Sequence, residues 1–166
     1  MVVGLGIDIV NKDRIARLLG IYGKKFVDRI FSIQELNNDR IKEIIRNDTS
    51  YYDFCDRKSK NHDRVVSYVA KRFAAKEAVA KAIGCGIGKL SFKDIHVFND
   101  NRGKPVVPIN AAIITALFHN ESVKGAMERF GDISQNVFDG QRISINVSIS
   151  DEKDNAVCMV IIEYIK

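Results

Sequence analysis

The segment Arg72–Gly84 constrains the fold of this chain more than any other. It contains no proline and is rich in alanine, so its intrinsic propensity predicts a helix. Glycines follow at positions 84, 86 and 88 and are typical of a helix end. We expect the helix to begin near Val65 and to end at Ile83. The other segments are best interpreted by how they would meet this helix.

The charged residues of this helix form a pattern that needs an explanation. Glu77 and Lys81 are four residues apart, so they share a face, and Arg72 and Lys76 lie about one turn nearer the start. A solvated helix surface with one ordinary ion pair would give the same pattern. A functional site would require a partner from elsewhere in the chain.

The first ten residues offer such a partner. Apolar residues alternate with Gly4, Gly6 and Asp8, as in a strand with two different faces. Two glycines weaken a strand, and they suggest that another backbone, a helix or a ligand approaches the face that carries Asp8. A buried acid is costly unless it is paired or binds a metal. A surface acid or a helix cap at the strand end would also explain Asp8.

Several segments, in the same order, resemble one enzyme family. They are Gly4–Val10, Arg72–Gly88, Leu90–Ile95, Asn99–Asp100, Gly103–Pro105, Val147–Ser150 and Ala156–Val157. Together they are similar to the holo-acyl-carrier-protein synthases, the small bacterial 4′-phosphopantetheinyl transferases. The match is specific because no single short motif carries it. It favours a pairing of Asp8 with Glu77.

The resemblance implies an α+β fold in which a long central helix packs on an antiparallel sheet. We expect a single phosphopantetheinyl transferase domain over residues 1–166, with insertions near residues 38–63 and 119–140. It also implies a homotrimer, with active sites in the clefts between neighbouring subunits. The sequence pattern itself supports helix and sheet but does not count subunits.

The implied reaction transfers 4′-phosphopantetheine from coenzyme A to a serine of apo-acyl carrier protein and releases 3′,5′-ADP. Asp8 and Glu77 match the ligands of Mg²⁺, a hard cation that prefers oxygen and keeps several waters. The serine proton would pass to a carboxylate or to metal-bound water. Lys81, one turn beyond Glu77, would balance charge on the departing phosphate.

Other matched residues are expected to bind the cofactor, either along its groove or near its nucleotide end. They are Arg72, Lys76, Gly84 and Gly86 along the groove, and Lys104 and Pro105 near the nucleotide. The sequence departs from the family at Asp151, where a histidine commonly follows the Ser-x-Ser pattern. Aspartate does not supply positive charge, so either a basic residue from an insertion replaces the histidine or the affinity for the cofactor is lower.

A basic stripe follows the first strand. Arg14, Arg17 and Lys24 recur at spacings of three and seven, which places them on one side of a helix, and Lys25 extends the patch. The formal charge of +5 favours an acidic partner. The resemblance assigns the stripe to the acidic recognition helix of apo-acyl carrier protein, although an ordinary solvated face would look the same.

Local signals predict the ends of further elements. Asn11 and Asn110 are expected to cap helices, and Ser32 with Glu35 forms a capping-box pattern. The helix over residues 111–118 is apolar all round, which predicts deep burial.

Hairpins are expected on either side of that helix. Ser91 and Asp94 resemble a helix start, but the alternation over residues 95–98 favours a strand from about Asp94. Residues 99–103 predict a turn, and Pro105 should lie at the start or edge of the returning strand. Residues 142–150 and 156–164 predict an antiparallel hairpin with one wet face.

The composition is that of an ordinary globular protein, with 46% hydrophobic and 28% charged residues. No apolar run approaches the ~20 residues that span a bilayer, and the first residues are interpreted as a strand and not as a signal peptide. We therefore expect a cytoplasmic protein with no membrane partner. Cys55, Cys85 and Cys158 are odd in number and far apart, which predicts reduced thiols.

Two other functions stay open at this point. A Mg²⁺-dependent nuclease or nucleic-acid-binding protein could also use two acids, a lysine and a basic surface. Aromatic residues are not interleaved with the basic stripe and no nucleic-acid motif is recognised, so we expect no nucleic-acid partner. An inactive structural relative is the other alternative, because of Asp151 and the two predicted insertions.

Overall fold

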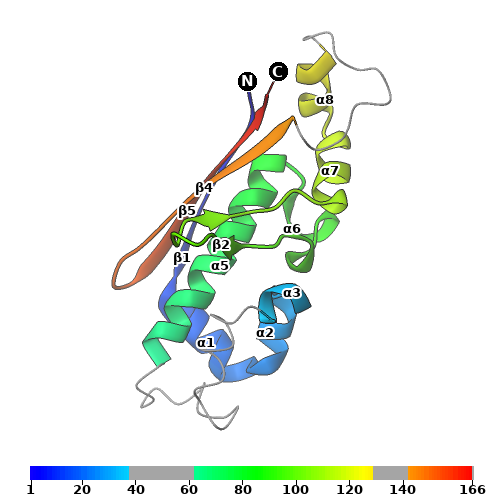
Figure 1. Ribbon diagram of the computed structural model, residues 1–166. Coiled ribbons are helices and arrows are strands. Elements are labelled where there is room, and N and C mark those ends of the chain that lie inside the picture. Colours follow the sequence, from blue (N-terminus) through cyan, green and yellow to red (C-terminus); the bar gives the residue numbers. More distant parts are fainter. Residues whose placement is uncertain (38–61, 129–141, 166) are drawn as a thin grey trace.

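The computed structural model describes residues 1–37, 62–128 and 142–165, which form an α+β arrangement (Figure 1). One layer is an antiparallel sheet in the order β1, β5, β4, composed of β1 (Val2–Asn11), β5 (Asn155–Tyr164) and β4 (Ile143–Asp151). The other is the long helix α5 (His62–Ile83), which lies along one face of the sheet. The predicted fold class and the predicted β4–β5 hairpin are confirmed, and α5 begins slightly earlier than expected.

The two glycines of β1 allow α5 to lie directly on the sheet. A Cβ atom at Gly6 would be 2.0 Å from the carbonyl oxygen of Ala78, and one at Gly4 would be 2.2 Å from that of Ala82. No side chain fits at these distances, so the backbones of strand and helix touch. Ala78 and Ala82 lie about one turn apart on the same face of α5, and their small side chains permit this contact. The expected close approach is confirmed.

The outer face of the sheet, away from α5, is largely apolar and exposed. The exposed fractions are 65% for Leu5, 59% for Ile7, 67% for Ile9 and 43% for Met159. In the strand register Ile7 lies opposite Met159, which lies opposite Ser148. The outer face is therefore apolar over β1 and β5 and polar over β4.

Three short helices cover the first half of α5, namely α1 (Lys12–Tyr22), α2 (Lys24–Ile30) and α3 (Ile33–Leu36). The Asn11 side chain caps α1 by accepting a hydrogen bond from the backbone N–H of Arg14 at 3.1 Å. Ser32 and Glu35 form a reciprocal capping box that starts α3. Both predicted caps are confirmed.

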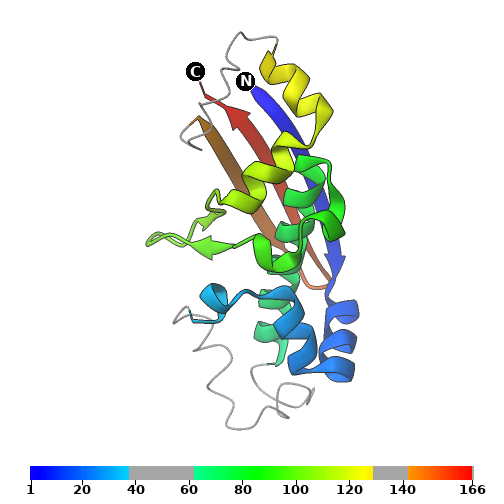
Figure 2. The same cartoon turned by 90° about the vertical axis from the view of Figure 1, so that its right-hand side faces the viewer.

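The segment between α5 and β4 contains short elements. They are α6 (Gly86–Lys89), the 3₁₀ turn η2 (Phe92–Asp94), β2 (Phe98–Asn99), β3 (Pro105–Val106), α7 (Ala111–Phe118) and α8 (Glu121–Glu128). Figure 2 shows the β2–β3 hairpin projecting to the left, beyond the edge of the sheet that β4 forms. Pro105 starts β3, as expected, and Asn110 caps α7.

Two expectations for this segment are wrong. Ser91 and Asp94 form a capping box that starts η2, so the strand predicted from Asp94 begins only at Phe98. The backbone N–H of Val97 donates to the Glu35 carboxylate instead of to a neighbouring strand. The helix α7 buries only Ile113 and Leu117, because one side of it packs on the core and the rest lies at the surface.

Most of the two predicted insertions lies outside the described residues. His62 and Asp63 form the first turn of α5, and residues 121–128 form α8. No helix in the described parts of the chain is long and apolar enough to cross a membrane.

Candidate active site

The contact between β1 and α5 brings Asp8 and Lys81 together. Asp8 follows Gly6 on the face of β1 that meets α5, and Lys81 is the neighbour of Ala82 in the helix. The Lys81 ammonium donates to an Asp8 carboxylate oxygen at 2.8 Å and to the carbonyl oxygen of Ile7 at 3.1 Å. The Asp8 side chain is 13% exposed and that of Lys81 is 52% exposed, so the pair opens to solvent on the lysine side.

Glu77 belongs to the same electrostatic group. Burial raises the pKa of Glu77 and the negative charge of Asp8 raises it further, whereas Lys81 and Arg14 lower it. Asp8 lies opposite Cys158 in the strand register, and burial together with Asp8 raises the pKa of that thiol to about 12. Two carboxylates that repel each other favour a cation beside them.

This pair of acids fits a hard divalent cation. Mg²⁺ is commonly held by one or two carboxylates, with substrate phosphates and waters as its other ligands. No cluster of three or more His, Cys, Asp or Glu side chains that could hold a metal ion occurs in the described part of the chain. A cation at Asp8 and Glu77 would therefore take its remaining ligands from substrate and water.

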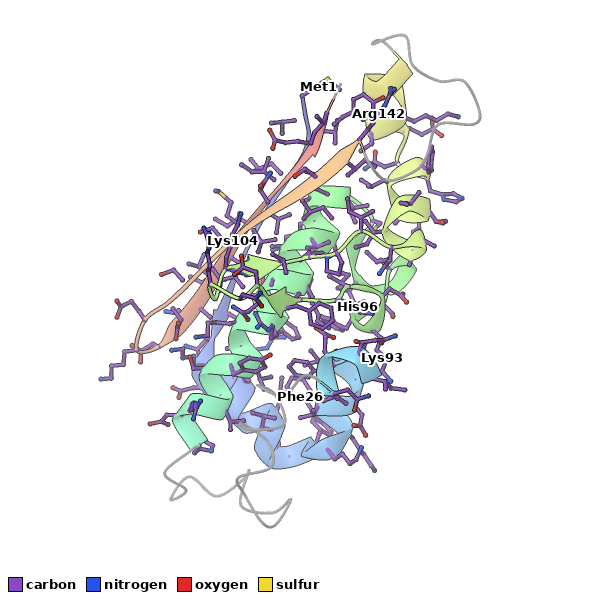
Figure 3. All side chains as sticks on the ribbon, in the orientation of Figure 1. Met1, Phe26, Lys93, His96, Lys104 and Arg142 are labelled. Carbon is purple, nitrogen blue, oxygen red and sulfur yellow. The ribbon has the colours of Figure 1, made fainter. Side chains whose placement is uncertain are left out.

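Glu77 also lines a pocket of about 670 Å³ between α5, α1 and α2, which we call the Glu77 pocket. Its apolar wall includes Phe73 and Phe92, whose ring centres are 5.0 Å apart. Phe26 of α2, labelled in Figure 3, lines the same pocket. The pocket thus combines an aromatic wall with a carboxylate whose pKa is raised.

Cations of α1 and α2 surround this pocket. Arg14, Lys25 and Arg29 line it, and Arg14 contributes to the electrostatics of Glu77. Arg17 and Lys24, the other residues of the predicted basic stripe, are exposed but are not among its lining residues. Sequence reasoning missed Arg29, although its spacing of four from Lys25 would have placed both on one helix face.

A second pocket of about 480 Å³, the Arg72 pocket, lies between α5, β4 and the β2–β3 hairpin. The buried Arg72 side chain stacks over the Tyr68 ring at 4.7 Å and donates to the Tyr68 hydroxyl at 3.1 Å and to Asn99. Both acceptors are neutral, so they do not balance the guanidinium charge. Pro105 lines the same pocket, whereas Lys104 is exposed near the hairpin turn (Figure 3).

Asp151 lies at the edge of the Arg72 pocket, beside the ammonium groups of Lys12 and Lys71. Its carboxylate accepts hydrogen bonds from Lys12 at 2.7 Å and from the Ser67 hydroxyl at 2.6 Å, and it pairs with Lys71 at 3.1 Å. Burial raises the pKa of Asp151, but these hydrogen bonds and the charge of Lys71 outweigh burial and hold the pKa well below its usual range. Within the described residues, the cations beside Asp151 therefore come from α1 and α5.

Lys76 does not lie in a cofactor groove, contrary to the prediction. Its ammonium is completely buried and donates to Glu35 at 2.6 Å, to the carbonyl of Ile30 at 2.6 Å and to that of Phe92 at 2.9 Å. These acceptors use all three of its N–H groups. Burial lowers the pKa of Lys76 to about 8, although Glu35 acts in the opposite direction.

The predicted glycines lie apart from both pockets. Gly84 ends α5 with a φ of 79°, and Gly86 has a φ of 67°. Gly84 lines a third pocket together with Cys85 and residues of α7, and Gly86 is exposed. The residues predicted to bind the cofactor are thus divided among separate parts of the molecule.

Comparisons with known proteins agree on one family. A family model described as the 4′-phosphopantetheinyl transferase superfamily matches residues 4–145. A holo-[acyl-carrier-protein] synthase of Geobacillus sp. (strain WCH70) is 38% identical over 164 residues, covering 98% of this chain and 98% of that protein.

Solved structures share the fold over nearly the whole chain. The holo-(acyl-carrier-protein) synthase of Bacillus anthracis str. Ames, in complex with CoA (3′,5′-ADP), is 32% identical with a TM-score of 0.62, and the match covers 99% of this chain and 98% of that one. The holo-[acyl-carrier-protein] synthase of Neisseria meningitidis is 31% identical with a TM-score of 0.62, and the match covers 98% and 99% of the two chains.

Proposed function

The chain belongs to the holo-acyl-carrier-protein synthase family of 4′-phosphopantetheinyl transferases, and on that premise we propose how its residues carry out the reaction. The enzyme transfers 4′-phosphopantetheine from coenzyme A to a serine of apo-acyl carrier protein and releases 3′,5′-ADP. The observation that carries our assignment of roles is the group formed by Asp8, Glu77 and Lys81 at the contact of β1 with α5.

We assign the acids of this group to the metal and to the proton. Asp8 and Glu77 would hold Mg²⁺, which neutralises charge on the diphosphate when it is bound. A carboxylate of the pair would accept the proton of the attacking serine. Lys81, 2.8 Å from Asp8, stabilises the negative charge of the departing phosphate.

Coenzyme A phosphates are assigned to the Arg72 pocket. Arg64, Lys71 and Arg72 line it, and the acceptors that Arg72 meets among the described residues, Tyr68 and Asn99, are neutral. Pro105 lines the same pocket and would contact the nucleotide end of the cofactor, with the exposed Lys104 beside it. This arrangement provides positive charge without the histidine that the family commonly has at position 151.

Apo-acyl carrier protein is assigned to the surface of α1 and α2. Arg14, Lys25 and Arg29 line the Glu77 pocket, and Arg17 and Lys24 extend the positive surface beyond it. An acidic carrier helix that docks here would deliver its serine toward Glu77. Charge complementarity of this kind chiefly raises the association rate and selects the partner.

We also infer that copies of the chain assemble through the outer face of the sheet, as a homotrimer. The supporting observation is the exposure of Leu5, Ile7 and Ile9 at alternate positions of β1, which share one face of the strand, beside Met159 of β5. Contiguous exposed apolar surface of this kind is typical of an interface.

The test is incubation with coenzyme A, Mg²⁺ and apo-acyl carrier protein, followed by intact-mass measurement of the carrier. A mass gain of one phosphopantetheine is expected from the wild type and from the control Glu121→Gln, which alters an exposed acid on α8. Asp8→Asn and Glu77→Gln should lose at least about 99% of the turnover while keeping the wild-type circular dichroism spectrum.

The possible outcomes separate the alternatives. Near-normal turnover by either acid variant would contradict the assigned roles. No mass gain with any metal or carrier would support an inactive relative. Mg²⁺-dependent degradation of nucleic acid would support the nuclease, whereas DNA binding that disappears at modest salt would indicate electrostatics alone.

A further inference from the structure

Lys76 and Glu35 form a buried ion pair that has no role in the proposed reaction steps. Both side chains are 0% exposed, and Lys76 Nζ lies 2.6 Å from Glu35 Oε2. Glu35 also accepts hydrogen bonds from the backbone N–H groups of Ser32 at 2.9 Å and Val97 at 3.0 Å. The pair therefore links α5 with α3 and with the segment that leads into β2.

The lysine reaches two walls of the Glu77 pocket. It donates to the backbone carbonyls of Ile30, the last residue of α2, and Phe92, the first residue of η2. Both residues line the Glu77 pocket, and Lys76 immediately precedes Glu77 in α5. One ammonium thus ties two walls of the pocket to the turn of helix that carries its carboxylate.

Stability alone does not explain such a pair. Removing two charges from water costs free energy that their attraction often fails to recover, and replacing a buried pair by neutral side chains of similar volume is commonly neutral or stabilising. What the pair does supply is fixed geometry, because the three donors of Lys76 and both oxygens of Glu35 are all engaged.

We propose that Lys76 and Glu35 are positioning residues that hold α2 and η2 at a fixed distance from Glu77, so that the incoming carrier serine is aligned with this carboxylate. The inference rests on the proposed function, because it takes the Glu77 pocket as the place where carrier and carboxylate meet. Neither side chain touches substrate.

The double variant Lys76→Met with Glu35→Gln tests the proposal, since it leaves no unpaired charge in the core and keeps the side-chain volumes. We expect a melting temperature several degrees below that of the wild type, because the buried carbonyls of Ile30 and Phe92 lose their donor. We also expect a Kd for coenzyme A within about twofold and a kcat at saturating substrates that falls at least about tenfold. A loss of kcat with an intact fold and intact cofactor binding is a readout that a purely structural role would not give.

Two comparisons make the result decisive. Ile113→Val, in the buried face of α7, should lower the melting temperature slightly without changing kcat, which calibrates the effect of stability alone. Glu77→Gln is assayed in parallel. If this variant is active, the role proposed for Glu77 in the reaction fails. If it is inactive and the double variant has a normal kcat, only the positioning role of Lys76 and Glu35 fails.

If the double variant does not fold, Lys76→Arg is assayed, because it keeps a positive charge beside Glu35 while changing the geometry of the donors, and the same fall in kcat is expected. A normal kcat in the folded variant would overturn the proposal. It would also be overturned if neither variant folds, because the pair would then be an element of stability.

Discussion

Replacing Gly6 with alanine should push α5 away from β1. The new Cβ atom would lie 2.0 Å from the carbonyl oxygen of Ala78 and 2.6 Å from the backbone nitrogen of Ala82. Ordinary contact begins near 3.4 Å, so the helix backbone has to retreat by roughly 1.4 Å, the difference between 3.4 and 2.0 Å. Overpacking of this kind costs about 1–3 kcal/mol.

The same displacement should separate the proposed catalytic group of Asp8, Glu77 and Lys81. Added to the 2.8 Å between Lys81 and Asp8, it would break their hydrogen bond and move Glu77 relative to Asp8. A misplacement of about 1 Å can lower a rate by about a hundredfold, so we expect kcat to fall by that factor.

Urea unfolding and the carrier mass assay measure the two effects of Gly6→Ala separately. The matched control is Gly20→Ala in α1, where an added Cβ meets no atom within 4 Å. It should stabilise the protein by about 0.5–1 kcal/mol and leave turnover unchanged, because alanine is the better helix former. Wild-type stability and turnover in Gly6→Ala would refute the argument that the strand backbone touches the helix.

Three further changes test other parts of the molecule. Arg14→Glu should raise the KM for apo-acyl carrier protein about tenfold while the Kd for coenzyme A stays within about twofold, and equal losses in kinetics and calorimetry would contradict the carrier role of α1. Asp151→Asn should lower the free energy of unfolding by about 2 kcal/mol at neutral pH. Because folding lowers the pKa of Asp151, its stabilising effect is present above the ordinary carboxyl pKa of about 3.9 and is lost as the pH falls toward the lower folded value. Urea titrations of wild type and variant should therefore converge on acidification, and a constant difference would show that ionisation of Asp151 is irrelevant. If the proposed homotrimer forms through the exposed outer face, Ile7→Lys should convert it to monomers in light-scattering measurements, and an unchanged mass would exclude this face as the interface.

The sequence predicted features that depend on short-range chemistry. The capping box at Ser32 is formed by residues three apart, so its hydrogen bonds can be inferred without knowing the fold. The approach of α5 to Gly4 and Gly6 was also predictable, because strand glycines and helix alanines are both small. The contact of α5 with these glycines determines where Asp8 lies.

Long-range packing explains what sequence reasoning missed. Lys76 and Lys81 both looked like surface cations of one helix, but only the placement of Glu35 on α3 shows that Lys76 is buried. The competition at Ser91 and Asp94 between a helix start and a strand was decided partly by Val97, whose N–H reaches the same Glu35. Helix α7 looked buried because its composition is apolar, whereas its exposure depends on its place at the edge of the fold.

The pairing of β1 with β5 also bears on how the enzyme matures on the ribosome. In the described structure, β1 has β5 as its strand neighbour, and Asp8 lies opposite Cys158. Because synthesis proceeds toward the C-terminus, Asp8 emerges from the exit tunnel well before residues 155–164, which form its strand partner. We therefore expect the growing polypeptide to remain inactive until residues 155–164 are free to fold. The site that contains Asp8 can form only after this late segment has been synthesised.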